Sequence, residues 1–234
     1  MPIHCPITIR GMSKEEFGAL DYAVMRCAFE TQKALGRLCD EQVYRNGFAA
    51  RLGAAGIGQV QTEVPISVSF RDFNKVYRID LLLNHAAVYE LKAAAALVPK
   101  HEAQLLHYLF LLDGERGKLV NFRPAKVESS FVNNPVRKDA RWKIDLDDGR
   151  WTELGERSVQ LRELVIALLL DWGGYLDFAL YTEALTHLLG GNERVSRMVP
   201  LQLEDTVLGN QRVLLLDEKT AFRVNRAHKK NTAL

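Results

Sequence analysis

The sequence predicts an α/β protein, with two helices, a group of apolar strands, a third helix and a further strand. Three observations carry this prediction. Apolar residues recur at helical spacing up to about residue 55. At 60–70, and again at 77–92, apolar side chains alternate or run together as they do in buried strands. Pro99 then suits the first turn of a helix that reaches a glycine-containing turn at 113–117.

Boundary signals support the individual elements. Ser13, followed by acidic residues, predicts a helix N-cap, and Gly36 ends that helix. The glycines at 53–58 lack the G-x-G-x-x-G spacing and do not follow a strand, so a helix-to-strand connection is favoured over nucleotide binding. A turn at 72–75 precedes the hairpin. The expected elements are, in order, a short strand at 7–9, helices at 13–35 and 40–55, a strand at 60–70, a hairpin at 77–92, a helix at 100–112 and a strand at 118–122.

Length and composition are those of an ordinary soluble globular protein. The 234 residues are 47% hydrophobic and 26% charged, enough for one substantial core or for a core with an appended subdomain. The net charge is only +2, so a phosphate-binding surface would need local clustering of basic residues. The three cysteines lack metal-ligand spacing and fit reduced thiols. With no apolar signal core at the N-terminus and no run long enough to span a membrane, we expect a cytoplasmic protein.

The hairpin at 77–92 carries the most informative residues of the chain. Successive strand side chains point to opposite faces of a sheet, so Glu90 and Lys92 share one face. Asp80 joins them if the loop centred on His85 has an odd number of residues and position 80 pairs with position 90. A slip of one residue would send Asp80 to the other face. The functional interpretation therefore requires one particular register.

The residue types in this pattern suit phosphodiester chemistry. Two carboxylates a few ångströms apart form a hard oxygen site for Mg²⁺ or Mn²⁺, which lowers the pKa of bound water and neutralises charge on a phosphate. A neighbouring lysine can orient that water or hold the phosphate as a compact charge. The alternative is a solvent-facing strand with ordinary charges, which a pattern as short as D-x9-E-x-K leaves open. The apolar neighbours favour the metal site, because unpaired charges in a buried sheet are costly.

The helix after the hairpin adds two polar candidates. Gln104 and Tyr108 are one turn apart and share a face of that helix. From spacing alone, a polar stripe at the boundary of the helix is the favoured interpretation. We expect the nearby His107 to be a surface or boundary residue and not a ligand.

The N-terminal 135 residues resemble the GxxExxY family, a branch of the PD-(D/E)XK nuclease superfamily that also contains RecB-type and Cas4-type nucleases. One position departs from the family pattern: Leu38 stands where members usually have glycine, three residues before Glu41, which puts the local turn in doubt. The matching segments are Ala28-Phe29-Glu30, Leu35-Gly36, Glu41-Gln42-Val43-Tyr44, Glu63-Val64-Pro65, Tyr77-Arg78-Ile79-Asp80, Glu90-Leu91-Lys92, Pro99, His101-Glu102-Ala103-Gln104-Leu105-Leu106, Tyr108-Leu109 and Leu119-Val120-Asn121-Phe122.

The resemblance implies a restriction-endonuclease-like core, a mixed central sheet flanked by helices, and a Mg²⁺-dependent (or Mn²⁺-dependent) nuclease. Nucleic acid would be the substrate, with DNA favoured over RNA. A module that binds nucleic acid or a partner without cutting is the alternative, and a scaffold whose C-terminal part carries the role is a third interpretation. The implied metal ligands are Glu41, Asp80 and Glu90, and the implied catalytic residues are Lys92, Gln104 and Tyr108.

Residues 136–234 are predicted to form a C-terminal extension that packs on the core at 1–135 or on a second copy of the protein. A homodimer is therefore one of the expected possibilities. Its start, up to about Trp151, is polar and turn-rich and is expected to be a linker or loop. The basic residues at the end suit contact with a nucleic-acid backbone or a solvated terminus. The expected elements are helices at 159–170 and 176–189 and strands at 195–203 and 213–224, and the basic residues are Arg223, Arg226, His228, Lys229 and Lys230.

Overall fold

The computed structural model describes residues 2–136 and 138–225, and it divides into two units. The first unit comprises Met1–Val68 and Lys75–Ala140, and the second comprises Ser69–Asn74 and Arg141–Leu234. The second unit is therefore built from two separate stretches of the chain.

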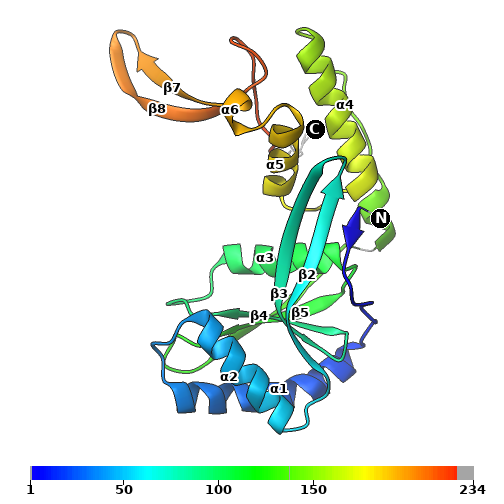
Figure 1. The fold of residues 1–234 in the computed structure, drawn as a ribbon, viewed down its shortest axis with the longest axis vertical. Coiled ribbons are helices and arrows are strands. Elements are labelled where there is room, and N and C mark those ends of the chain that lie inside the picture. Colours follow the sequence, from blue (N-terminus) through cyan, green and yellow to red (C-terminus); the bar gives the residue numbers. More distant parts are fainter. Residues whose placement is uncertain (1, 137, 226–234) are drawn as a thin grey trace, which may run out of the picture. The chain divides into compact units, whose positions relative to one another are not determined.

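The first unit is organised around a six-stranded mixed sheet with the strand order β1-β2-β3-β4-β5-β6 (Figure 1). The strands β4 and β5 run parallel and are joined by the helix α3, whereas the pairs β1–β2, β3–β4 and β5–β6 are antiparallel. This is the restriction-endonuclease-like α/β fold expected from the sequence. The strands are β1 Ile3–His4, β2 Val60–Phe70, β3 Phe73–Leu83, β4 Ala87–Lys92, β5 Arg116–Asn121 and β6 Glu128–Asn133.

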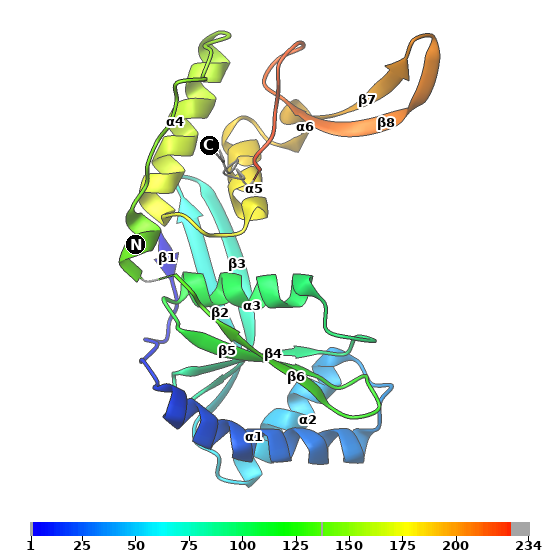
Figure 2. The same ribbon diagram turned by 180° about the vertical axis from the view of Figure 1, so that it is seen from behind.

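Helices cover both faces of this sheet: α1 (Lys14–Leu35) and α2 (Glu41–Ala54) lie on one face, and α3 (Pro99–Leu111) lies on the other (Figure 2). The hydrophobic core between the sheet and the first two helices includes Tyr89 and Leu91 of β4. Because side chains alternate along a strand, the neighbouring Glu90 and Lys92 point toward α3.

The start of α1 confirms the predicted N-cap. The Ser13 hydroxyl accepts a hydrogen bond from the Glu16 amide at 3.1 Å, and the Glu16 carboxylate accepts one from the Ser13 amide at 2.8 Å. This reciprocal pair satisfies two backbone donors that the first helical turn leaves open.

The loop between β3 and β4 fixes the register of the hairpin. Three residues separate the strands, and the first two, Asn84 and His85, adopt positive φ values of 52° and 55°. The Asn84 side chain also accepts a hydrogen bond from the Gln59 amide at 2.8 Å. A Cβ on Gly58 would lie 2.1 Å from that side-chain oxygen, so position 58 has to be glycine for the loop to keep this contact.

The second unit contains the helices α4, α5 and α6, the end of a 3-10 helix and a three-stranded sheet. Its core includes Trp172, which is fully buried and packs against Phe70 and Phe73. The Trp172 indole donates a hydrogen bond to the Ser69 carbonyl at 3.0 Å. The elements are η1 Lys138–Trp142, α4 Glu156–Trp172, α5 Phe178–Leu188, α6 Asn192–Val195, β7 Ser196–Leu203, β8 Thr206–Leu215 and β9 Ala221–Phe222.

Two boundaries and one strand within residues 1–135 differ from the expected elements. The leading strand is at Ile3–His4 and not at 7–9, because Pro6 has no amide hydrogen with which to continue the pairing. The expected turn at 72–75 is shorter, since Arg71 takes a φ of 53° and β3 already begins at Phe73. The edge strand β6 was not predicted, because its sequence ESSFVN has little apolar alternation.

The C-terminal expectations also need correction. The segment expected to be a linker or loop contains η1, whose buried Arg141 donates two hydrogen bonds to the Trp172 carbonyl at the end of α4. The strand expected at 213–224 is replaced by β8 and the short β9. No helix within the described residues is long and apolar enough to cross a membrane. The predicted basic tail from Arg226 onward lies outside the described residues.

Candidate active site

Asp80 and Glu90 lie on adjacent strands in the register that the sequence argument required. The observed pairs are Leu81 with Tyr89, Leu82 with Val88 and Leu83 with Ala87. Continuing this register by one residue sets Asp80 opposite Glu90. The Leu91 amide, the next residue of β4, donates a hydrogen bond to Asp80 Oδ2 at 2.8 Å. The backbone pairing of the two strands is therefore replaced here by a contact with a side chain. The two carboxylates consequently share one face at a strand end.

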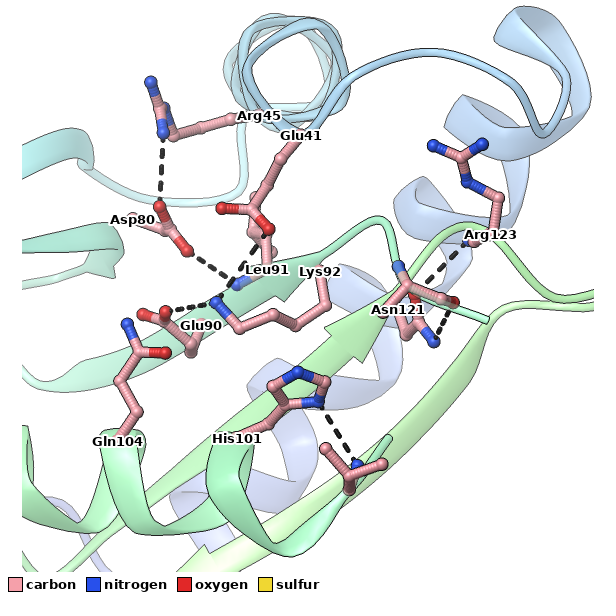
Figure 3. Close-up of polar contacts among 12 residues, drawn as sticks. Glu41, Arg45, Asp80, Glu90, Leu91, Lys92, His101, Gln104, Asn121 and Arg123 are labelled. Atoms are coloured by element: carbon pink, nitrogen blue, oxygen red, sulfur yellow. Dashed lines mark hydrogen bonds and ion pairs between the residues drawn. The ribbon is translucent and has the colours of Figure 1, made fainter. Parts of the chain in front are cut away.

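Lys92 lies directly beside Glu90. Its ammonium nitrogen is 2.6 Å from Glu90 Oε1 and 3.9 Å from Glu41 Oε2 (Figure 3). The exposed fractions of Asp80, Glu90 and Lys92 are 6%, 2% and 8%, so three charged groups are held almost entirely out of water. Burial on this scale requires mutual pairing.

Glu41 approaches the strands from α2, as its position at the start of that helix suggested. Its side chain is 40% exposed and thus lies at the mouth of the site. Burial raises its pKa and the repulsion of Asp80 adds to this, while the nearby Lys92 and Arg45 act in the opposite direction.

The buried carboxyl of Glu90 has a strongly perturbed pKa. Burial, followed by repulsion from Asp80, raises the pKa of Glu90 well above its ordinary range, although Lys92 opposes the shift. The pKa of Lys92 is also raised: burial acts against its charged form, but attraction by Glu90, Glu41 and Asp80 outweighs burial. The carboxyl groups of Glu41, Asp80 and Glu90 thus surround the single ammonium of Lys92. This excess of acidic groups favours the binding of an additional positive ion.

Gln104 and Tyr108 are brought together on α3. The Gln104 amide nitrogen donates to the Tyr108 hydroxyl oxygen at 3.0 Å. Burial raises the pKa of Tyr108 to about 12, and the charges of the three carboxylates contribute to the increase. The phenol is thus neutral at physiological pH and keeps its proton available for donation. Gln104 extends from α3 toward Glu90, and Glu41 approaches the site from the opposite side (Figure 3).

A buried asparagine holds the segment that follows Lys92. Asn121 is fully buried; its side chain accepts from the Ala94 amide at 3.0 Å and donates to the Ala94 carbonyl at 2.9 Å. The segment after β4 is thereby fixed to the end of β5. This contact restricts the backbone at Lys92 and was not identified as a site feature from the sequence.

Sequence reasoning gave no site role to Arg45 or to Glu63. Arg45 lies one helical turn after Glu41, and its guanidinium is 3.2 Å from Asp80 Oδ1 and 2.7 Å from Glu63 Oε1. The i,i+4 spacing from Glu41 was the available signal. A helix surface offers many such charged neighbours, so the spacing alone did not single out Arg45.

A second buried lysine–carboxylate pair lies on the other face of the sheet. Lys118 Nζ is 2.5 Å from Asp21 Oδ2, and the Tyr89 hydroxyl donates to Asp21 Oδ1 at 3.2 Å. Both Asp21 oxygens therefore have a partner, and this pair joins α1 to the sheet. We assign it a structural role, because its polar atoms are mutually satisfied.

Tyr44 has a structural role that bears on the departure at Leu38. The Tyr44 ring is fully buried and stacks on Phe122 with a centroid distance of 4.8 Å. Its hydroxyl donates to the Gly36 carbonyl at 2.8 Å, and Gly36 has a φ of 75°. The turn after α1 is therefore anchored through Gly36, while Leu38 is 84% exposed.

We expect Tyr44→Phe to lower the free energy of unfolding by about 1 kcal/mol, because it removes one hydrogen bond but keeps the stacked ring. Urea denaturation followed by circular dichroism measures the change. Tyr22→Phe is the matched control, since Tyr22 is 83% exposed. A reaction rate that collapsed in Tyr44→Phe at unchanged stability would contradict the structural assignment.

The residues present fit a divalent metal in one respect and oppose it in another. Glu90 Oε2 is buried and has no hydrogen-bond partner among the described residues, which leaves a carboxyl oxygen for a ligand. Both oxygens of Asp80, by contrast, already have partners. Within residues 2–136 and 138–225, no group of three or more histidine, cysteine or acidic residues is arranged to hold a metal ion. A metal at this site would therefore need rearrangement of side chains, mainly of the cations that now pair with the carboxylates.

Comparison with protein-family models supports a nuclease-like class for this fold. Residues 19–132 match the family model described as the PD-(D/E)XK nuclease superfamily. That segment contains all six predicted site residues, and the superfamily suggests nuclease activity. A solved structure entitled "Crystal structure of SSO0001" is similar with 21% sequence identity, covering 65% of this chain and 70% of that chain, at a TM-score of 0.34. No curated protein matches the sequence.

Proposed function

We propose that this protein is a metal-dependent nuclease that hydrolyses phosphodiester bonds, with DNA preferred over RNA. The observation that carries the proposal is the register that sets Asp80 opposite Glu90, with Lys92 beside them, at the end of two paired strands. The superfamily match over 19–132 supports it. Assignment to the GxxExxY branch is part of the proposal and is supported by Glu41 and Tyr44.

In the proposed reaction each residue has a distinct task. Asp80, Glu90 and Glu41 would hold Mg²⁺ or Mn²⁺, which when bound supplies an activated water and neutralises phosphate charge. Lys92 would position the attacking water or a phosphate oxygen through its compact ammonium. Gln104 and the neutral phenol of Tyr108 would form a hydrogen-bonding edge along the strand being cut.

A binding module that does not cut is the second candidate, and one observation favours it. Arg45 and Lys92 already pair with Asp80 and Glu90, so the carboxylates are stabilised without a metal. Incubating the protein with single-stranded and double-stranded DNA and RNA, with Mg²⁺ or Mn²⁺ and beside Asp80→Ala, separates the candidates. Cleavage that depends on metal and on Asp80 supports the nuclease, and binding without cleavage supports the module.

Metal binding has its own expected signature in stability. A divalent ion that binds only the folded protein should stabilise the wild type by about 2.7 kcal/mol at roughly 100 times its Kd. The melting temperature should rise accordingly in the wild type and much less in Asp80→Ala. Asp145→Ala, which removes an exposed aspartate far from these residues in sequence, is the control and should respond like the wild type. Equal shifts in wild type and Asp80→Ala would count against a metal at Asp80.

A further inference from the structure

Arg45 lies between two carboxylates, those of Glu63 and Asp80, where a metal cation could otherwise bind. One guanidinium nitrogen, Nη1, is 2.7 Å from Glu63 Oε1 and 3.2 Å from Asp80 Oδ1. The Arg45 side chain is only 13% exposed. A single positive group thus bridges a proposed metal ligand and an acidic residue to which the proposed reaction gives no task.

Glu63 is held in a backbone conformation that needs an explanation. It lies within β2, yet its φ is 53°, in the left-handed region that residues with a Cβ adopt at a cost. Its carboxylate makes the shortest contact of Arg45. The strained residue therefore presents a fixed negative charge to Arg45, beside the site and outside the strand pair that carries Asp80 and Glu90.

The contacts of Asp80 place Arg45 in competition with a metal. Asp80 Oδ2 accepts from the Leu91 amide and Oδ1 faces Arg45, so both oxygens of this carboxylate are engaged. An ion that coordinates Asp80 has to displace the guanidinium or bind within a few ångströms of its charge. Glu63 offers the displaced guanidinium a second partner, which lowers the cost of leaving Asp80.

We propose that Arg45 is a built-in competitor for the divalent cation at Asp80, and that phosphate groups of the nucleic acid relieve this competition by drawing Arg45 to themselves. A guanidinium binds phosphate oxygens through paired hydrogen bonds, so the backbone of the substrate is a suitable acceptor. Metal and substrate then bind cooperatively, and each raises the affinity for the other by the same factor. This inference rests on the proposed nuclease function and specifies how its site is regulated.

Two substitutions test the competition, because they should change metal affinity in opposite directions. Isothermal titration with Mn²⁺ in the absence of nucleic acid is expected to give a Kd about tenfold lower in Arg45→Gln than in the wild type, since a nearby like charge has been removed. Glu63→Gln should raise the Kd for Mn²⁺ severalfold. Asp80 is then the one carboxylate partner left to Arg45 among those described, so Arg45 stays paired with Asp80 and competes more strongly with the metal. If Arg45 and Glu63 only support the fold, both variants should change the affinity in the same direction.

A matched control and a stability measurement accompany these titrations. Arg51→Gln removes a second arginine from α2, one that pairs with Glu30 at 3.6 Å, and should leave the Kd for Mn²⁺ unchanged. Melting temperatures measured without metal show whether each variant is folded. If Arg45→Gln does not fold, the expected rise of Kd in Glu63→Gln still tests the proposal.

The coupling with nucleic acid is tested by a second titration. A short phosphorothioate DNA, which carries backbone charge and resists cleavage, should lower the Kd for Mn²⁺ of the wild type after the metal bound by the DNA itself is subtracted. Arg45→Gln should show little of this effect. A methylphosphonate DNA of the same sequence has no backbone charge and should have no effect on either protein.

The outcomes separate this inference from the proposed function. Wild type and Arg45→Gln that bind Mn²⁺ with equal affinity would overturn the competition and leave the metal site intact. The absence of Mn²⁺ binding in both proteins, with and without DNA, would overturn the metal site and the competition together.

Discussion

Replacing Lys92 with alanine is expected to lower the single-turnover cleavage rate by about a hundred- to a thousandfold, the usual cost of removing one group that stabilises the reacting phosphate. The expectation follows from the position of its ammonium, 2.6 Å from one proposed metal ligand and 3.9 Å from another. Nucleic-acid affinity should change only a few fold, because Lys92 supplies at most one phosphate contact among several. Rapid-mixing kinetics at saturating enzyme and a separate binding titration measure the two quantities.

Lys92→Arg should not restore the rate. A planar guanidinium is larger than an ammonium and cannot enter a space that leaves Lys92 8% exposed without displacing its partners. Lys33→Met, at an exposed position of α1, is the control and should react like the wild type. If Lys92→Ala binds nucleic acid far more weakly but cleaves bound substrate at the normal rate, Lys92 holds the substrate and takes no part in the chemistry.

The largest effect on stability is expected from Trp172→Ala, at about 3–5 kcal/mol. The side chain is fully buried, packs against Phe70, Phe73 and Tyr181, and donates a hydrogen bond to the Ser69 carbonyl. Its removal leaves a large cavity in the second unit and takes away the hydrogen bond to the Ser69 carbonyl. Urea denaturation followed by tryptophan fluorescence measures the loss, since the two remaining tryptophans, Trp142 and Trp151, also lie in this unit.

Trp142→Ala is the matched control for this experiment. Trp142 is 46% exposed, and its main ring contact is the Arg141 guanidinium at 5.2 Å. Its removal should cost no more than about 1 kcal/mol. Similar losses in the two variants would mean that Trp172 does not organise the second unit.

The sequence was most informative where local chemistry determines structure. The N-cap at Ser13 and the odd loop at 84–86 depend on neighbouring residues, so both were predicted correctly. The loop then set the pairing of Asp80 with Glu90, because a sheet register follows from the length and conformation of its turn. The roles of Lys92, Gln104 and Tyr108 are still predictions from the resemblance.

The features that could not be predicted depend on contacts between distant parts of the chain. Arg45 reaches Asp80 only because α2 packs beside β4, the strand that pairs with β3, and the φ of Glu63 gives no signal in its sequence. Trp172 falls between the two helices expected at 159–170 and 176–189. Its role in the core could not be predicted, because its partners Phe70 and Phe73 lie about one hundred positions earlier. Edge strand β6 escaped prediction because its exposed face mixes Phe131 with polar residues and its other face has little apolar character.

The membership of Ser69–Asn74 in the second unit has a consequence for the order of events during translation. The hydrogen bond from Trp172 to Ser69 spans 103 positions. At the 5–20 residues per second of typical protein synthesis, the ribosome needs roughly 5–20 s to make that length of chain. Throughout this interval the apolar rings of Phe70 and Phe73 are without their tryptophan partner. Exposed aromatic groups on a nascent hairpin can bind chaperones or start aggregation. The yield of folded protein should therefore depend on how the turn between β2 and β3 is protected until α4 has been synthesised.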